Sequence, residues 1–111
     1  MTFVIGPLYA GKEEYVRSAL GWEDETFSLR TVRDVQELAP LAEDLSALAD
    51  RLSEKEVVIA TETGSGVVPT DPEERFAREQ AGRLNCLLAE RAENVIRVCC
   101  GLPQVLKGRL L

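Results

Sequence analysis

A stretch near the start of the sequence has the composition and spacing of a phosphate-binding loop. It matches the pattern G-x-x-x-x-G-K and continues with a glutamate, so that its residues are Gly6, Pro7, Leu8, Tyr9, Ala10, Gly11, Lys12 and Glu13. In such loops the glycines let backbone amides surround an anion, and the lysine reaches the terminal phosphates of a nucleotide. An ordinary turn between a strand and a helix, with a surface lysine, is the alternative that this segment alone leaves open.

The last position of this stretch departs from the phosphate-binding pattern. A serine or threonine normally follows the lysine, because its hydroxyl ligates magnesium. Glu13 stands there instead. A carboxylate can also bind magnesium, but it carries negative charge toward the phosphates, and its longer side chain reaches a different position.

The neighbouring sequence predicts the elements that would position this loop. Phe3-Val4-Ile5 predicts a short buried strand before it, and residues 13–20 predict a helix that ends at Gly21. Residues 26–29 alternate in polarity and predict a short second strand. The leucine spacing over residues 34–52 predicts a short helix that ends near Ala39 and a longer one that begins at Pro40.

A second glycine-containing loop, residues 61–69, follows a predicted strand at residues 56–60. Asp71 and Pro72 then predict the start of a helix that runs to about Ala92. A strand is expected over residues 95–100, and a short edge strand over residues 105–107. Strand, loop, helix and strand form a βαβ unit, whose loop at the carboxyl end of a parallel strand is a common ligand site.

The composition limits the classes of function. The 111 residues predict a single domain, and the net charge of −6 argues against nucleic acid or an anionic membrane as a partner. The sequence contains no histidine, which excludes histidine-dependent nucleophiles and histidine-ligated metals. It has neither a signal peptide nor an apolar run long enough to span a membrane, so we expect a cytoplasmic protein.

The three cysteines, Cys86, Cys99 and Cys100, predict neither a disulfide framework nor a zinc site. Their number is odd, and no two of them are spaced as Cys-x-x-Cys. Cys99 and Cys100 are neighbours in a predicted strand, and we expect both to be small core residues in a reducing compartment.

The motifs from about Val57 to Lys107 resemble the C-terminal half of a known family, the bifunctional adenosylcobinamide kinase/adenosylcobinamide-phosphate guanylyltransferases of cobalamin biosynthesis. The family pattern reads N-E-x-G-x-G-I-V-P, then R-x-F, then A-G-R-x-N-Q, then G-[IL]-P and a lysine. The corresponding segments here are Glu62 to Pro69, Arg75-Phe76, Ala81 to Asn85, and Gly101 to Pro103 with Lys107. The phosphate-binding loop of the family would fall on residues 6–13.

The resemblance implies an α/β fold: a three-layer, P-loop (RecA-like), mostly parallel sheet flanked by helices, shortened here to one domain over residues 1–111. Enzymes of the family phosphorylate adenosylcobinamide with a nucleoside triphosphate. They then transfer GMP through a guanylylated histidine, and they form oligomers. We therefore expect GTP or ATP as the ligand and a homo-oligomer as the assembly, and the resemblance also implies a corrinoid substrate.

The departures from the family pattern shape the functional hypotheses. The family chain is longer, and this sequence has no histidine for the guanylyl route. Thr61 replaces an asparagine, Cys86 a glutamine and Glu13 the serine of the loop. The first hypothesis is a degenerate homologue that binds GTP or ATP. The alternatives are a residual nucleoside-triphosphate-dependent adenosylcobinamide kinase and a non-catalytic interaction or scaffold protein.

The expected site consists of the loop residues Gly6 to Glu13, which would bind the phosphates of a nucleotide. Lys12 is the one candidate catalytic residue. We expect Mg²⁺ to accompany the nucleotide, held by Glu13 or Glu62, and we expect no tightly bound cofactor.

Overall fold

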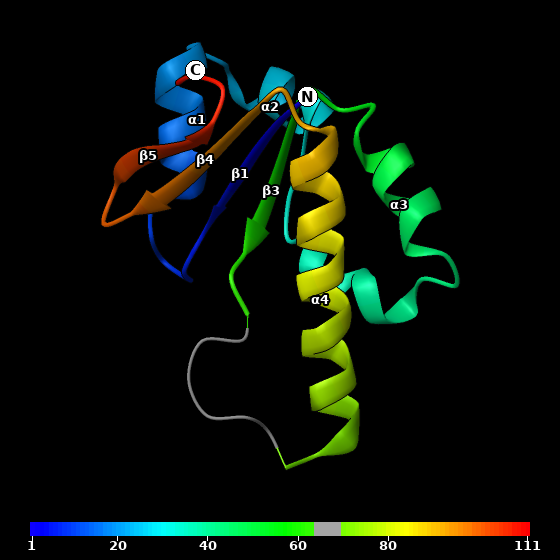
Figure 1. Ribbon diagram of the computed structural model, residues 1–111. Coiled ribbons are helices and arrows are strands. Elements are labelled where there is room, and N and C mark those ends of the chain that lie inside the picture. The colour runs from blue at the N-terminus through cyan, green and yellow to red at the C-terminus, as the bar shows by residue number, and fades with distance from the viewer. Residues whose placement is uncertain (64–69) are drawn as a thin grey trace.

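The central strand of the fold, β1 (Thr2–Gly6), lies between two parallel neighbours in the computed structural model, which describes residues 1–63 and 70–111 (Figure 1). β3 (Val57–Thr61) pairs with one side of β1 and β4 (Asn94–Cys99) with the other. β2 (Thr31–Val32) extends the sheet in parallel beyond β3, and β5 (Leu102–Lys107) pairs antiparallel with β4 at the opposite edge. The strand order is therefore β2-β3-β1-β4-β5.

Helices cover both faces of this sheet, as Figure 1 shows. α1 (Lys12–Leu20) and α2 (Asp24–Arg30) lie on one face, while α3 (Leu45–Leu52) and α4 (Pro72–Arg91) lie on the other. Side chains alternate along β1, so that Phe3 packs with Leu84 and Leu88 of α4, whereas Val4 packs with Val16 of α1. These two cores confirm the predicted α/β class, with a mostly parallel sheet flanked by helices.

The two long helices begin and end at the residues that the sequence indicated. α1 ends at Gly21, whose left-handed φ of 63° lets its N–H donate to the carbonyl of Arg17. α4 begins after Asp71, whose carboxylate accepts a hydrogen bond from the N–H of Glu73, with Pro72 in the first turn.

The strand predicted over residues 26–29 is wrong, because this segment belongs to helix α2. Only Phe27 is buried there, packed among residues of β1, β3 and α1. Four residues of alternating polarity cannot distinguish a strand from one helical turn that buries a single side chain. The strand itself lies just after the helix, at Thr31–Val32.

The two helices predicted over residues 34–52 are only partly present. The chain instead forms two short 3₁₀ helices, η1 (Val35–Glu37) and η2 (Ala39–Leu41), before α3. Ala42 is extended, with φ −80° and ψ 133°, which ends η2. The carboxylate of Asp44 accepts a hydrogen bond from the N–H of Ala47, so that α3 begins at Leu45, well after Pro40.

The prediction that Cys99 and Cys100 are core residues is also wrong. β4 ends at Cys99, which is half-buried, and Cys100 is exposed in the turn that follows, with a left-handed φ of 54°. Cys86 is exposed on α4. All three are free thiols.

Most of the second glycine-containing loop, residues 64–69, lies outside the described residues. The ligand site expected at that loop is therefore represented only by Thr61, Glu62 and Thr63. Over residues 1–63 and 70–111, no helix is both long enough and apolar enough to cross a membrane.

Candidate phosphate-binding site

The loop of residues 6–13 has the structural setting that its sequence pattern requires. It leaves β1 at Gly6 and enters α1 at Lys12. Because β3 and β4 flank β1 in parallel, the loop lies at the carboxyl edge of three strands. This is where open α/β sheets place their ligands.

Lys12 is held inward by the loop. Its side chain is 8% exposed, and its ammonium donates hydrogen bonds to the carbonyls of Gly6 at 3.2 Å and Pro7 at 2.7 Å. Burial lowers the pKa of Lys12, although the nearby carboxylates of Asp34 and Glu62 act in the opposite direction. The loop therefore holds a desolvated cation in a fixed position.

Two glycines of the loop are required by close contacts. A Cβ on Gly6 would lie 2.1 Å from the carbonyl oxygen of Val98 on β4. Gly11 has a φ of 87°, and a Cβ there would lie 3.3 Å from the Cα of Gly101. The N–H of Gly101 also donates to the carbonyl of Ala10 at 2.8 Å, so the turn between β4 and β5 is hydrogen-bonded to the loop.

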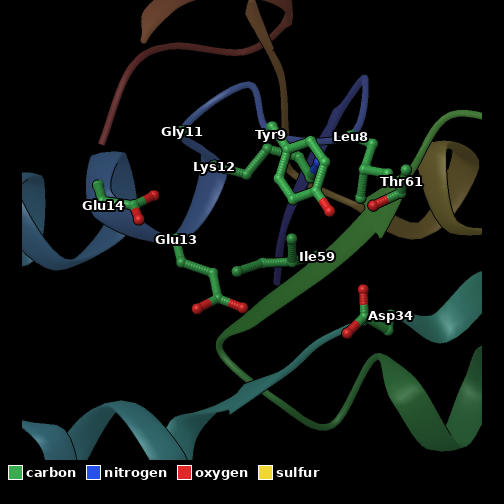
Figure 2. Close-up of a pocket in the computed structure, with 9 residues that line it drawn as sticks. All are labelled: Leu8, Tyr9, Gly11, Lys12, Glu13, Glu14, Asp34, Ile59 and Thr61. Carbon is green, nitrogen blue, oxygen red and sulfur yellow. The ribbon is translucent and has the colours of Figure 1, made fainter.

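A cavity of about 260 Å³ opens beside the loop (Figure 2). Its walls come from the loop and the first turn of α1, from the end of β3, and from the residue just before η1. The residues that line it are Leu8, Tyr9, Gly11, Lys12, Glu13, Glu14, Asp34, Ile59 and Thr61. Of the predicted loop residues, Leu8, Tyr9, Gly11, Lys12 and Glu13 therefore line one cavity, while Gly6, Pro7 and Ala10 do not line it.

Glu13 lies in this cavity but is engaged by an arginine. Both of its carboxylate oxygens accept hydrogen bonds from Nη1 of Arg33, at 2.9 and 3.1 Å. The bond to Glu13 raises the pKa of the Arg33 guanidinium. A metal that bound Glu13 would have to share this carboxylate with Arg33.

Glu62 lies beside the loop without lining the cavity. Its N–H donates to the carbonyl of Gly6 at 2.8 Å, and its carboxylate accepts bonds from Nε of Arg97 at 2.6 Å and from Nη2 at 3.0 Å. The hydrogen bonds from Arg97 lower the pKa of Glu62. The two predicted metal ligands, Glu13 and Glu62, are thus each paired with a different arginine.

Asp34 is a cavity residue that sequence reasoning did not single out. It follows β2 with a left-handed φ of 55°, and over the described residues its carboxylate is in no hydrogen bond or ion pair. Among the nearby carboxylates, Asp34 acts most strongly on the pKa of Lys12. Placing the second strand at residues 31–32 would have revealed it, since residues just beyond a parallel strand reach the ligand edge.

The charges of the cavity suit a phosphate chain only in company with a cation. One ammonium, from Lys12, faces the carboxylates of Glu13, Glu14 and Asp34. Within the described parts of the chain, no group of three or more Asp, Glu, Cys or His side chains is arranged to hold a metal alone. Magnesium is commonly bound by one or two carboxylates together with substrate phosphates and water, and Asp34 and Glu13 fit that mode.

Comparison with known proteins shows to which family most of the chain is similar. The sequence matches the cobinamide kinase / cobinamide phosphate guanyltransferase family over residues 22–106. It is also 37% identical over 78 residues to the bifunctional adenosylcobalamin biosynthesis protein CobP of Pseudomonas aeruginosa. That alignment covers 70% of this chain and 45% of the relative, so the chain spans less than half of that protein. The family match begins after Lys12, and the loop of residues 6–13 lies outside it.

Proposed function

Because the chain belongs to the cobinamide kinase / cobinamide phosphate guanyltransferase family, we propose that it is a degenerate homologue that binds the phosphates of GTP or ATP beside Lys12. The observation that carries this proposal is Lys12, which is 8% exposed and whose ammonium donates hydrogen bonds to two loop carbonyls at the carboxyl end of β1. Burying an ammonium that is not paired with a carboxylate is unfavourable. A bound anion would remove this cost, which supports an anion site at Lys12.

The volume of the cavity supports a binding mode in which the phosphates lie inside it and the nucleoside lies outside. Its volume of about 260 Å³ is small for a whole nucleotide, given that pockets for drug-sized ligands measure roughly 300–1,000 Å³. The phosphates would enter beside Lys12, and the nucleoside would lie against Leu8 and Tyr9, which are 64% and 95% exposed.

Magnesium would enter this site together with the nucleotide. Asp34 and Glu13 would hold it, and the ion would neutralise phosphate charge that the acidic cavity otherwise repels. Nucleotide binding should therefore depend strongly on Mg²⁺. Glu62 is the less favoured ligand, because it does not line the cavity and its two oxygens already accept hydrogen bonds from Arg97.

The second candidate function is a residual adenosylcobinamide kinase. The position of Asp34 in the cavity favours it. The Asp34 carboxylate lines the same cavity as Lys12, and in this alternative it would accept the proton of an attacking hydroxyl instead of binding Mg²⁺. The guanylyl route through a histidine has no counterpart in these 111 residues, which contain no histidine.

Thermal unfolding with GTP, ATP and GDP, each with and without Mg²⁺, tests the proposal. A nucleotide at about 100 times its Kd adds about 2.7 kcal/mol to the unfolding free energy, a rise in Tm of roughly 10 °C or more for a domain of this size. Lys12→Ala should abolish the rise. Lys55→Ala is the matched control, since its ammonium also donates to a backbone carbonyl, that of Leu29, away from the cavity.

The result that overturns the proposal is an unchanged Tm with every nucleotide at millimolar concentration in the presence of Mg²⁺. If binding is found, conversion of adenosylcobinamide to its phosphate by the wild type, lost in Asp34→Asn, would identify the kinase. Binding without turnover would identify the degenerate homologue.

A further inference from the structure

A second cavity, of about 220 Å³, lies next to the first one between α1 and the segment from α2 to β2. We call it the arginine cavity, and its lining residues are Arg17, Phe27, Ser28, Thr31 and Arg33. Among the described residues no carboxylate lines it, although the chain as a whole carries a net charge of −6. Two guanidinium groups and two hydroxyls around one small space form a lining of hydrogen-bond donors, which suits an anion.

The orientation of Arg17 is fixed by an aromatic ring. Its guanidinium lies 4.1 Å from the centroid of the Phe27 ring, and Phe27 is itself buried, at 3% exposed. Stacking holds the plane of the guanidinium and leaves its N–H edge for hydrogen bonds. Arg17 is therefore preorganised for a planar or tetrahedral oxyanion.

A buried hydroxyl in the same cavity has no partner. Thr31 is 8% exposed, and over the described residues its Oγ1 makes no hydrogen bond. An unsatisfied buried hydroxyl is unfavourable, and each one in a native protein calls for a reason. An anion in this cavity would supply the missing acceptor after a small shift of the side chain.

The existing ion pairs of the two arginines are exposed and easily exchanged. Arg17 pairs with Asp24, whose side chain is 94% exposed. Arg33 pairs with Glu13, and the Arg33 side chain is 58% exposed. Exposed pairs of this kind contribute little, so a doubly charged anion can compete for both arginines.

We propose that the arginine cavity is a binding site for a phosphate group, distinct from the loop of Lys12. The ligand is either free phosphate or the phosphate of an organic ester. Arg33 joins the two cavities through its bonds to Glu13. An anion that draws Arg33 away would release the Glu13 carboxylate toward the first cavity. This site does not depend on nucleotide binding at Lys12.

The test is an amide NMR titration of the full chain with inorganic phosphate, in a Lys12→Ala background that removes the cation of the first cavity. We expect saturable shifts centred on Phe27, Ser28 and Thr31. Arg33→Gln should weaken phosphate binding about tenfold, the loss expected for one charge-assisted contact. Arg17→Gln should also weaken phosphate binding about tenfold. If loss of the stacking on Phe27 unfolds the Arg17 variant, Arg33→Gln alone still tests the proposal.

Two further variants separate this site from general charge effects. Arg109→Gln makes the same change in net charge at an exposed residue that does not line the cavity, and it should leave phosphate binding within about twofold of its parent. Glu13→Gln should tighten phosphate binding, because it releases Arg33. A parallel titration with methyl phosphate distinguishes the sources: tighter binding of the ester supports an organic phosphate, and tighter binding of inorganic phosphate supports the free anion. The proposal is overturned if the shifts do not saturate, or if Arg33→Gln and Arg109→Gln behave alike.

Discussion

Lys12 is the residue at which opposing electrostatic effects meet. Burial disfavours its charged form, whereas Asp34, Glu62 and Glu13 favour it. Burial is the larger effect, so the pKa is lowered. Below the lowered folded-state pKa the buried ammonium therefore destabilises the unliganded fold, and this penalty disappears as the pH rises toward the unfolded value. A bound phosphate would reverse the balance by adding negative charge next to the amine.

The pair of Glu62 with Arg97 makes a prediction about acid stability. The pKa of Glu62 is lowered in the fold, so its contribution is fully present above the unfolded pKa and is lost as the pH falls through the folded pKa. Glu62→Gln should lower the unfolding free energy by about 0.5 kcal/mol near neutral pH, after allowance for solvent screening. Urea unfolding at about pH 7 and about pH 3 measures the difference.

The matched control for this prediction is Glu56→Gln. Glu56 pairs with Arg30 and its side chain is 56% exposed, compared with 26% for Glu62. We expect a smaller loss from the control at neutral pH. A loss from Glu62→Gln that is the same at both pH values would show that the pair does not act through ionisation of Glu62.

At the residue level, the sequence revealed the groups that belong to a contiguous motif. Lys12 and Glu13 were found because their spacing from Gly6 matches a known pattern, and the structure places both in one cavity. Asp34 and Arg33 were missed because only the fold brings them to the loop. The sheet register that does this depends on β2, a strand of two residues, which is too short to leave a periodic signal.

At the level of elements, the long and strongly patterned segments were predictable. β1 and β3 are apolar runs, and α4 has a cap, a proline in its first turn and a buried stripe. The segments over residues 24–30 and 35–44 were not, because their structure depends on tertiary contacts of single residues such as Phe27 and Val35. Local propensity is a weak guide where one buried side chain decides the conformation.

Two glycines in different elements should respond oppositely to the same substitution. Gly82 lies inside α4, and a Cβ there would meet no atom within 4 Å among the described residues. Gly82→Ala should therefore raise the unfolding free energy by about 0.5–1 kcal/mol, because alanine restricts the unfolded chain. Gly6→Ala should lower it by about 2 kcal/mol or more, because the Cβ collides with the carbonyl of Val98.

Urea unfolding of the two variants beside the wild type checks this pair of predictions. Each variant serves as the control for the other, since both add one methyl group. Destabilisation by Gly82→Ala would contradict the first of these predictions. Tolerance of Gly6→Ala would show that β1 and β4 can separate beside the loop.

At the scale of the whole molecule, the predicted fold class is confirmed, while the assembly stays a prediction. The α/β class followed from element order and from the family resemblance, and the sheet confirms it. The family match covers residues 22–106, yet the relative CobP is more than twice as long as the aligned part. Contacts with other chains are not encoded in periodicity, so the assembly stays a prediction.

We predict that the chain forms a homo-oligomer. β5 is one of the two edge strands of the sheet, and its residues Leu102, Val105 and Leu106 are 70%, 40% and 56% exposed. An exposed apolar edge favours pairing with another strand. Light scattering at high micromolar concentration should give a molecular mass that is a multiple of 12.2 kDa. Leu106→Lys should reduce this mass.

The control for the assembly prediction is Leu29→Lys, which places the same charge on a leucine of α2 that is 67% exposed. It should leave the mass unchanged. A strictly monomeric mass for the wild type at these concentrations would contradict the prediction.

The most direct test of the central claim is calorimetric titration of GTP and ATP, with Mg²⁺, into the wild type, Lys12→Ala and Lys55→Ala. We expect saturable heat for the wild type and Lys55→Ala, and none for Lys12→Ala or when Mg²⁺ is withheld. Absence of binding to the wild type, or equal binding to Lys12→Ala, would contradict a nucleotide site at this loop.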